Sequence, residues 1–274
     1  MTRVAERHKW NETFEWIPTT GPFRGLTDAQ AKAYDEQGFF VLEGAFDAET
    51  IGRIRDEIDP FEEKSTDWLR SKGGSVAISD ADAITFTTHL VKRSAFLKEI
   101  CSSGVLADVA HDLIGPDVRL YWDQAVYKKP EKPRPFPWHQ DNGYAYVEPQ
   151  QYLTCWIALT DATEDNGCPL VVPGLHKLGT LEHWWTDYGF QCVEDPSDVI
   201  PAATKAGGIV VFSSLTPHQT GPNVTNDVRK AYIVQYAPTG AEISRDENGE
   251  RKRETADDPE RQFEILRDGE VVAG

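Results

Sequence analysis

The sequence has 274 residues, of which 39% are hydrophobic and 11% aromatic, enough apolar mass for one large domain or two small ones. Its 28 basic and 45 acidic side chains give a formal charge of −17, which disfavours nucleic acid or an anionic membrane surface as the main partner. No stretch approaches the ~20 apolar residues that span a bilayer, and the first nine residues carry charges where a signal peptide would need an apolar run. We therefore expect a cytoplasmic protein, with its four scattered cysteines buried and unpaired.

Residues 1–116 are predicted to be mainly helical. Thr27 and Gln30 have the capping-box spacing at the start of a helix that ends before Gly38, and 39–42 is a short apolar strand. Asp47 is expected to cap a second helix, in which isoleucines recur at helical spacing. The apolar pattern of 95–114 predicts a third helix.

From about residue 117 the pattern is typical of strands, which we expect at 118–127, 152–161, 168–173, 208–213 and 228–237. Helices followed by many short strands favour helices packed on an antiparallel double sheet or barrel, because a doubly wound sheet would alternate the two. We expect one domain over 1–274, with its β core at 117–238. Residues 239–274 are rich in charge, and we expect a polar, partly mobile tail there.

A His-x-Asp pair, His139 and Asp141, and a separate His218 make a plausible metal-ligand set. Two imidazoles and one carboxylate form the facial triad that holds non-haem Fe(II) with coordination positions left open. Residues i and i+2 of an extended strand point the same way, so the pair can reach one ion, while His218 must come from another strand. Either motif alone is more often a surface pair or a structural histidine. Arg229, eleven residues after His218 on the next expected strand, strengthens the metal interpretation.

The residues around these positions resemble the phytanoyl-CoA dioxygenase family. The likeness covers about 25–240, and its motifs occur in the family order: Pro137-Trp138-His139-Gln140-Asp141-Asn142-Gly143-Tyr144, Trp156-Ile157-Ala158-Leu159-Thr160-Asp161-Ala162, Asp165-Asn166-Gly167-Cys168, Val172-Pro173-Gly174-Leu175-His176-Lys177, and His218-Gln219-Thr220-Gly221-Pro222-Asn223 through Val228-Arg229-Lys230-Ala231-Tyr232. It implies a mainly β fold, a double-stranded β-helix (jelly-roll, cupin-like) core with N-terminal helices. It also implies an Fe(II)- and 2-oxoglutarate-dependent dioxygenase. Such an enzyme would use O2 to hydroxylate an unactivated C–H bond of a small organic substrate, releasing succinate and CO2.

Carried over residue by residue, the resemblance implies His139, Asp141 and His218 as iron ligands. It implies that Arg229 binds the distal carboxylate of 2-oxoglutarate, which suits a guanidinium because it pairs bidentately and stays charged when buried. Thr220 would supply a hydroxyl to this cosubstrate, and Trp156 would lie beside it or serve only in core packing. Gln124 is a further candidate for the cosubstrate or the substrate. Related halogenases carry a small residue in place of the carboxylate, so Asp141 favours hydroxylation.

The sequence departs from the family in two places. Leu175 replaces the serine of the usual Pro-Gly-Ser-His turn, and residues 82–87 lack the lysine with which many members hold 2-oxoglutarate. We expect Tyr121 or Thr87 to supply a hydroxyl there instead. The aromatic segment 183–190 is either a small core under a loop or a lid that keeps water from the site, with Tyr144 and Tyr146 as further pocket residues. The histidines outside the triad, His183 among them, are expected to be structural or solvated.

Two other classes stay open. One is a cupin-like isomerase, epimerase or dioxygenase that uses a metal without 2-oxoglutarate, favoured if no carboxylate-sized slot lies in front of Arg229. The other is a non-catalytic metal-binding sensor barrel. The fold hosts many substrates, so the family does not identify this one. The acidic balance disfavours a coenzyme A thioester, and we expect a small metabolite or natural-product intermediate; the oligomeric state is not set by the sequence.

Overall fold

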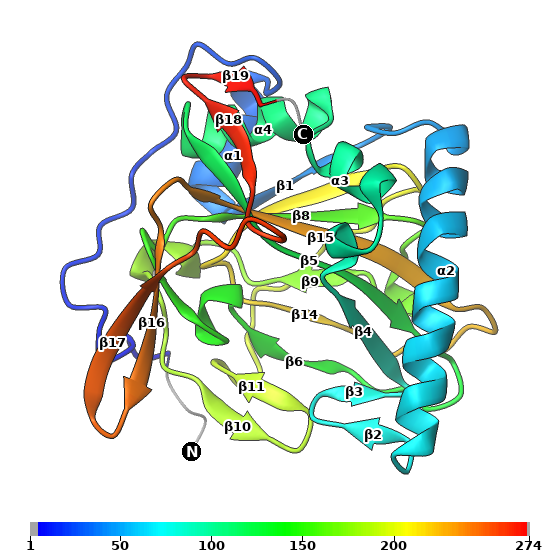
Figure 1. Cartoon of the computed structure of the whole chain (residues 1–274). Helices are drawn as coiled ribbons and strands as arrows, with labels where there is room; N and C mark the ends of the chain where they lie inside the picture. Colours follow the sequence, from blue (N-terminus) through cyan, green and yellow to red (C-terminus); the bar gives the residue numbers. More distant parts are fainter. Residues whose placement is uncertain (1–4, 273–274) are drawn as a thin grey trace.

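Two antiparallel sheets form the body of the protein in the computed structural model, which describes residues 5–272 (Figure 1). The large sheet has the order β1-β13-β8-β15-β5-β4-β3-β2, and the small sheet the order β12-β9-β14-β6. This is the mainly β, jelly-roll architecture that the resemblance implied. The strands of the large sheet are β1 (Phe39–Leu42), β2 (Ser75–Val76), β3 (Ser79–Asp80), β4 (Ile84–Thr88), β5 (Val118–Lys128), β8 (Leu153–Ala158), β13 (Ile209–Ser213) and β15 (Arg229–Pro238). Those of the small sheet are β6 (Phe136–His139), β9 (Pro169–Val171), β12 (Ile200–Pro201) and β14 (His218–Thr220).

Four α-helices pack on the outer face of the large sheet: α1 (Asp28–Gln37), α2 (Ala48–Ser71), α3 (Ala95–Cys101) and α4 (Gly104–Ile114). The predicted capping box of Thr27 and Gln30 is present, and Asp47 accepts a hydrogen bond from the backbone of Thr50. The single helix expected over 95–114 was wrong. Ser103 adopts an extended backbone, a conformation that serine favours at a helix start, and divides the segment into two helices. Residues 5–116 also supply four short strands, β1 to β4.

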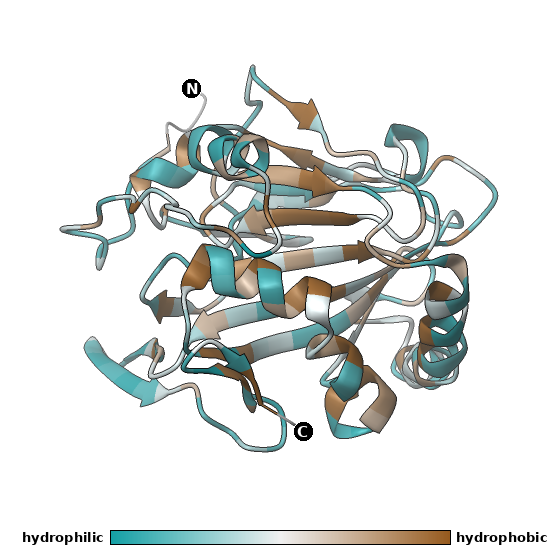
Figure 2. Ribbon diagram, turned by 90° about the horizontal axis from the view of Figure 1, so that it is seen from above, coloured by the Kyte–Doolittle hydropathy of each residue, from teal (hydrophilic) through white to brown (hydrophobic). Residues whose placement is uncertain are grey.

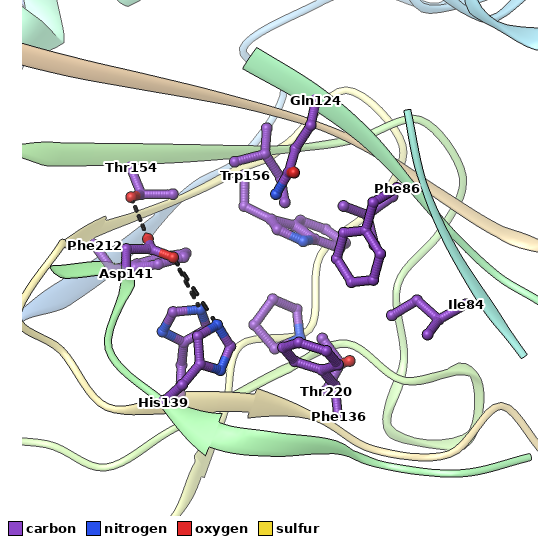
Figure 3. Close-up of a pocket in the computed structure, with 14 residues that line it drawn as sticks. Ile84, Phe86, Gln124, Phe136, His139, Asp141, Thr154, Trp156, Phe212 and Thr220 are labelled. Carbon is purple, nitrogen blue, oxygen red and sulfur yellow. Dashed lines mark hydrogen bonds and ion pairs between the residues drawn. The ribbon is translucent and has the colours of Figure 1, made fainter. Parts of the chain in front are cut away.

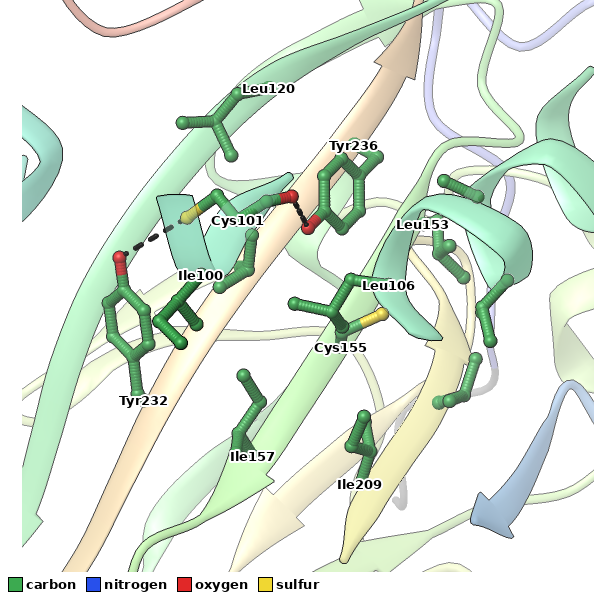
Figure 4. Close-up of a cluster of buried hydrophobic side chains, with 14 of the residues drawn as sticks. Ile100, Cys101, Leu106, Leu120, Leu153, Cys155, Ile157, Ile209, Tyr232 and Tyr236 are labelled. Carbon is green, nitrogen blue, oxygen red and sulfur yellow. Dashed lines mark hydrogen bonds between the residues drawn. The ribbon is translucent and has the colours of Figure 1, made fainter. Parts of the chain in front are cut away.

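The main hydrophobic core lies between these helices and the large sheet. Figure 4 shows its centre, where Tyr236 donates a hydrogen bond to the Cys101 carbonyl at 2.6 Å and the Tyr232 hydroxyl lies 3.5 Å from the Cys101 sulfur. Central strands carry long hydrophobic stretches, whereas the helices alternate hydrophobic and hydrophilic colours (Figure 2). All four cysteines are buried and unpaired, as predicted.

The C-terminal residues form strands and not a loose tail. β16 (Glu242–Glu247) and β17 (Glu250–Thr255) form a separate three-stranded sheet with β7 (Tyr146–Glu148). β18 (Glu264–Arg267) pairs with β5 and with β19 (Glu270–Val271). Ile265 and Leu266 are fully buried against the main core. Two apolar residues in a charged stretch are too weak a pattern to predict this strand, which pairs with the start of β5 on the side that β4 does not reach.

Short elements complete the small-sheet side. The 3-10 turns are η1 (Leu90–Lys92), η2 (Asp141–Gly143), η3 (Glu164–Asn166) and η4 (Leu175–Leu178). The aromatic segment forms a hairpin, β10 (Trp184–Thr186) and β11 (Gly189–Gln191), tied to β6 by a hydrogen bond from the Cys192 amide to the Trp138 carbonyl. None of the described helices is long and apolar enough to cross a membrane.

Candidate metal centre and cosubstrate pocket

One end of the β6–β14 ladder, at the edge of the small sheet, brings the predicted metal ligands together. β6 ends at His139, and Gln140 remains extended, so Asp141 faces the same cavity although it already begins the turn η2. His218 opens β14 and is the register partner of His139. Each histidine Nε2 lies 3.9 Å from the Asp141 Oδ1 (Figure 3), and the three ligand atoms lie within 4.8 Å of one another. With metal–ligand bonds of about 2 Å, one ion can contact all three.

The tautomers of both histidines fit a metal. His139 Nδ1 is 2.8 Å from the Pro137 carbonyl, and His218 Nδ1 is 3.0 Å from the Thr216 carbonyl. A carbonyl oxygen only accepts, so each Nδ1 carries the proton and each Nε2 presents its lone pair to the cavity. Burial, together with neighbouring His218, holds the pKa of His139 well below its ordinary value. The two oriented imidazoles match a divalent transition ion.

A short relay orients the third ligand. Thr154 donates a 2.6 Å hydrogen bond to Asp141 Oδ2 (Figure 3), and Gln235 donates to the Thr154 hydroxyl at 3.2 Å. The relay holds one carboxylate oxygen and leaves Oδ1 turned toward the histidines. Neither Thr154 nor Gln235 stood out in the sequence, where only strand alternation could have put them on the cavity side.

Several predicted cosubstrate residues surround the same cavity. Gln124, Trp156 and Thr220 line it together with the triad and an apolar wall (Figure 3). Arg229 lies immediately behind this lining, with its guanidinium 5.1 Å from the Trp156 ring centroid, and it is only 1% exposed. One nitrogen donates to the Val126 carbonyl, but Nε and Nη2 have no partner. The apolar wall is Ile84, Phe86, Val126, Phe136, Pro169, Phe212 and Ile233.

A second buried basic side chain lies beside Arg229. Lys128 is its register partner at the end of β5, and the lysine Nζ donates to the Thr220 hydroxyl at 2.8 Å and to its carbonyl at 3.0 Å. Burial and the nearby Arg229 lower the pKa of Lys128 to about 6, and burial lowers the pKa of Arg229 to about 10. Across residues 5–272, no carboxylate forms an ion pair with either group. Such a pair is costly unless an anion joins it.

Lys128 changes the expectation for the missing family lysine. Tyr121, expected to supply a hydroxyl, instead packs on Tyr152 in a separate cluster, and Thr87 is buried outside the cavity lining. Tyr146 packs against Trp10, away from the metal ligands. The sequence Lys128-Lys129-Pro130 resembles a surface turn, which hid Lys128 from prediction. Only its pairing with Arg229 brings it to the pocket.

The fold and this ligand set define a jelly-roll oxygenase of the non-haem iron class. A family model described as phytanoyl-CoA dioxygenase (PhyH) matches residues 34–231. The chain therefore belongs to the phytanoyl-CoA dioxygenase family.

Individual relatives differ in what their names say they act on. Human peroxisomal phytanoyl-CoA dioxygenase is 26% identical over 231 residues, covering 77% of this chain and 68% of the relative. A methylphosphonate hydroxylase of Gimesia maris is 27% identical over 215 residues, covering 77% of this chain and 80% of that relative. The crystal structure of EctD from S. alaskensis with 2-oxoglutarate and 5-hydroxyectoine shares the fold, with a TM-score of 0.66 and 22% identity, covering 89% of this chain and 86% of that one.

Proposed function

We propose that the protein is an Fe(II)- and 2-oxoglutarate-dependent dioxygenase that hydroxylates an unactivated C–H bond of a small organic substrate, releasing succinate and CO2. The observation that carries the proposal is the triad's place in one cavity with Thr220, backed by two buried basic side chains, Arg229 and Lys128, that have no carboxylate partner among the described residues. A dicarboxylate with one end at the metal and the other at these basic groups suits that arrangement. Family membership supports the same activity.

The protein's own residues have distinct parts in this proposal. His139, Asp141 and His218 would hold the iron, and the iron, when bound, would supply the activation of O2. Arg229 pairs with the distal carboxylate of 2-oxoglutarate, since its Nε and Nη2 are free donors. Lys128 acts with it through Thr220, in place of the family lysine. The apolar wall excludes water from the reacting end.

The same features weigh against the other classes. A cupin-like isomerase or a metal-binding sensor has no need of two buried basic side chains behind the metal cavity. The carboxylate of Asp141 favours hydroxylation over halogenation. The relatives' named substrates are chemically diverse, so the substrate proposal stays at a small metabolite. Four unpaired cysteines agree with a reducing compartment such as the cytoplasm.

The direct test is succinate release from 2-oxoglutarate with Fe(II) and O2. An Fe(II)–2-oxoglutarate charge-transfer band should appear on titration of the anaerobic protein, which separates an oxygenase from a sensor or isomerase. Candidate metabolites are then screened for stimulated succinate formation. Turnover that survives both Asp141→Ala and His218→Ala would show that the assignment is wrong.

A further inference from the structure

Gln140, the residue between the two ligands of the His-x-Asp pair, is fully buried, and both its side-chain nitrogen and its side-chain oxygen are hydrogen-bonded. Its side-chain amide donates to the carbonyls of Gly179 and Leu215, at 3.0 and 2.6 Å, and its amide oxygen accepts from the Leu181 amide at 2.7 Å. Leu215 belongs to the loop that leads to His218. Gln140 therefore ties the metal-ligand segment both to the approach to the third ligand and to residues 179–181.

A histidine that is not a metal ligand completes this connection. His183 Nε2 accepts a hydrogen bond from the backbone N–H of Gln140 at 3.0 Å, while its Nδ1 lies 2.9 Å from the Leu181 carbonyl. The carbonyl requires the proton on Nδ1, which leaves Nε2 free to accept, so one neutral tautomer satisfies both bonds. The ring also packs on Gly143, where an added Cβ would lie 2.1 Å from Nε2. This contact explains a glycine at 143.

His183 lies directly before the hairpin β10–β11. Strand β11 is connected to the ligand His139 by packing of aromatic rings. Tyr144 packs edge-on against His139, with ring centroids 5.4 Å apart, and against Phe190 at 5.3 Å. The Phe190 amide donates to the Tyr144 hydroxyl at 3.2 Å. Gly189, at φ +137°, allows this approach, since a Cβ there would lie 2.6 Å from that hydroxyl. The residue just before the hairpin and the second strand of the hairpin thus both contact the ligand segment and the turn that follows it.

We propose that His183 is a positioning residue for the metal centre, which fixes the backbone between His139 and Asp141 and joins the hairpin β10–β11 to it. The geometry of the two ligands then depends on the seating of the hairpin. The inference rests on the proposed function only in the identity of the metal, because the contacts themselves involve the protein alone. The sequence predicted a structural role for His183 and gave a lid as one possible role of residues 183–190. The contacts of His183 and Phe190 connect this segment directly to the residues around the metal ligands.

The test uses the full-length protein with Co(II) as a spectroscopic probe of the metal site. His183→Phe keeps a ring but removes both hydrogen bonds, and we expect a roughly 10- to 100-fold loss of Co(II) affinity, an altered visible absorption spectrum and faster chymotrypsin cleavage after Trp185 or Tyr188. His183→Gln places an amide oxygen near the Nε2 position and should recover much of the affinity. Gly143→Ala should reproduce the defect by displacing the ring. In a His183→Ala background the same alanine should add little, since its clash is gone.

Two controls separate positioning from a general loss of stability. Ile157→Ala, on the opposite face of the large sheet, should lower the Tm without changing Co(II) binding or hairpin cleavage, and His111→Phe on α4 should change none of the three. If His183→Phe lowers the Tm as Ile157→Ala does but leaves Co(II) affinity and spectrum unchanged, His183 is only structural and the proposal is overturned. If His183→Phe does not fold, Gly143→Ala decides by the same readouts. Absence of 2-oxoglutarate turnover would contradict the proposed function but not this inference, which Co(II) binding tests separately.

Discussion

The two faces of the large sheet are built from the same strands but differ in chemistry. Along β8, Cys155 and Ile157 point into the core beneath the helices, while Thr154 and Trp156 point into the metal cavity. The outer face is mostly apolar, although Asp123 Oδ1 there has no hydrogen-bond partner. The inner face borders the metal cavity, and two nitrogens of the Arg229 guanidinium behind it have no partner, which costs stability until a ligand pairs with them. We therefore expect outer-face mutations to lower stability and inner-face mutations to lower function.

Asp141→Ala, on the opposite wall of the cavity that the inner face borders, tests the cavity side most severely. We expect 2-oxoglutarate-dependent succinate formation to fall to background, because the carboxylate is the only anionic ligand of the triad. The Tm of the metal-free protein should stay the same or rise. Succinate assays and thermal unfolding measure the two effects, and a large fall in Tm would contradict the division between the faces.

Arg229→Met should weaken 2-oxoglutarate binding by about 2–5 kcal/mol, since the variant loses a buried charged partner of the distal carboxylate. The metal-free protein should unfold at the same or a higher temperature, because an unpaired buried charge is removed. Co(II) affinity in the absence of 2-oxoglutarate serves as the control and should not change. A Kd for 2-oxoglutarate equal to that of the wild type would remove Arg229 from the site.

Ile157→Ala is the matching change on the outer face. Deleting this fully buried side chain should lower the free energy of unfolding by about 2–5 kcal/mol through lost burial and a residual cavity. Denaturant titration measures the loss. The Kd values for Co(II) and 2-oxoglutarate should remain those of the wild type at temperatures where the variant is folded.

Thr154→Val keeps the side-chain shape but removes the hydroxyl that donates to Asp141. We expect metal affinity to fall about 10- to 100-fold, the usual effect of losing a hydrogen bond to a metal ligand. Thr154→Ser retains the hydroxyl and should bind metal almost as well as the wild type. Equal affinities for the valine and serine variants would show that the hydroxyl does not orient the carboxylate.

The smallest expected effect is a pH dependence from Lys128. Its pKa, lowered by burial and Arg229 to about 6 against 10.5 for an ordinary lysine, leaves it mostly neutral in the ligand-free protein at pH 7–8. A bound dicarboxylate favours the charged form, so binding takes up a proton and 2-oxoglutarate affinity should fall as pH rises above about 6, by at most about tenfold per pH unit. The other charged groups facing Lys128 are Arg229 and Arg134, both cationic.

Calorimetry in buffers of different ionisation enthalpy measures this proton uptake. Lys128→Met should reduce it, whereas Lys129→Met, which removes a lysine paired with Glu62, should not. Stability has a matching dependence: between about pH 6 and pH 10 the unfolded chain binds the proton that buried Lys128 lacks, so the free energy of unfolding should rise with pH over this range. An unchanged pH slope in Lys128→Met would contradict both expectations.

The sequence predicted best where one local pattern determines the structure. Strand β1 and the cap of α1 follow from local residue types, and the triad follows from a family motif whose spacing survives folding. Contacts between distant strands were not accessible. Lys128 lies behind Thr220 of the pocket lining because β5 pairs with β15, and Thr154 contacts Asp141 because β8 and η2 border the same cavity. Tyr121 failed as a prediction because its strand side was not set by the pattern alone.

The pairing of His139 with His218 in adjacent strands has a topological consequence. An ion held by both would close the whole intervening chain, hairpin included, into a loop, as a disulfide does. The conformational entropy that an unfolded chain loses on cross-linking increases with the length of the loop. A metal cross-link across so long a segment would therefore lower the entropy of the unfolded state substantially. Metal binding would then shift the equilibrium of the small sheet toward the folded state. The same metal–ligand bonds would contribute both to stability and to catalysis.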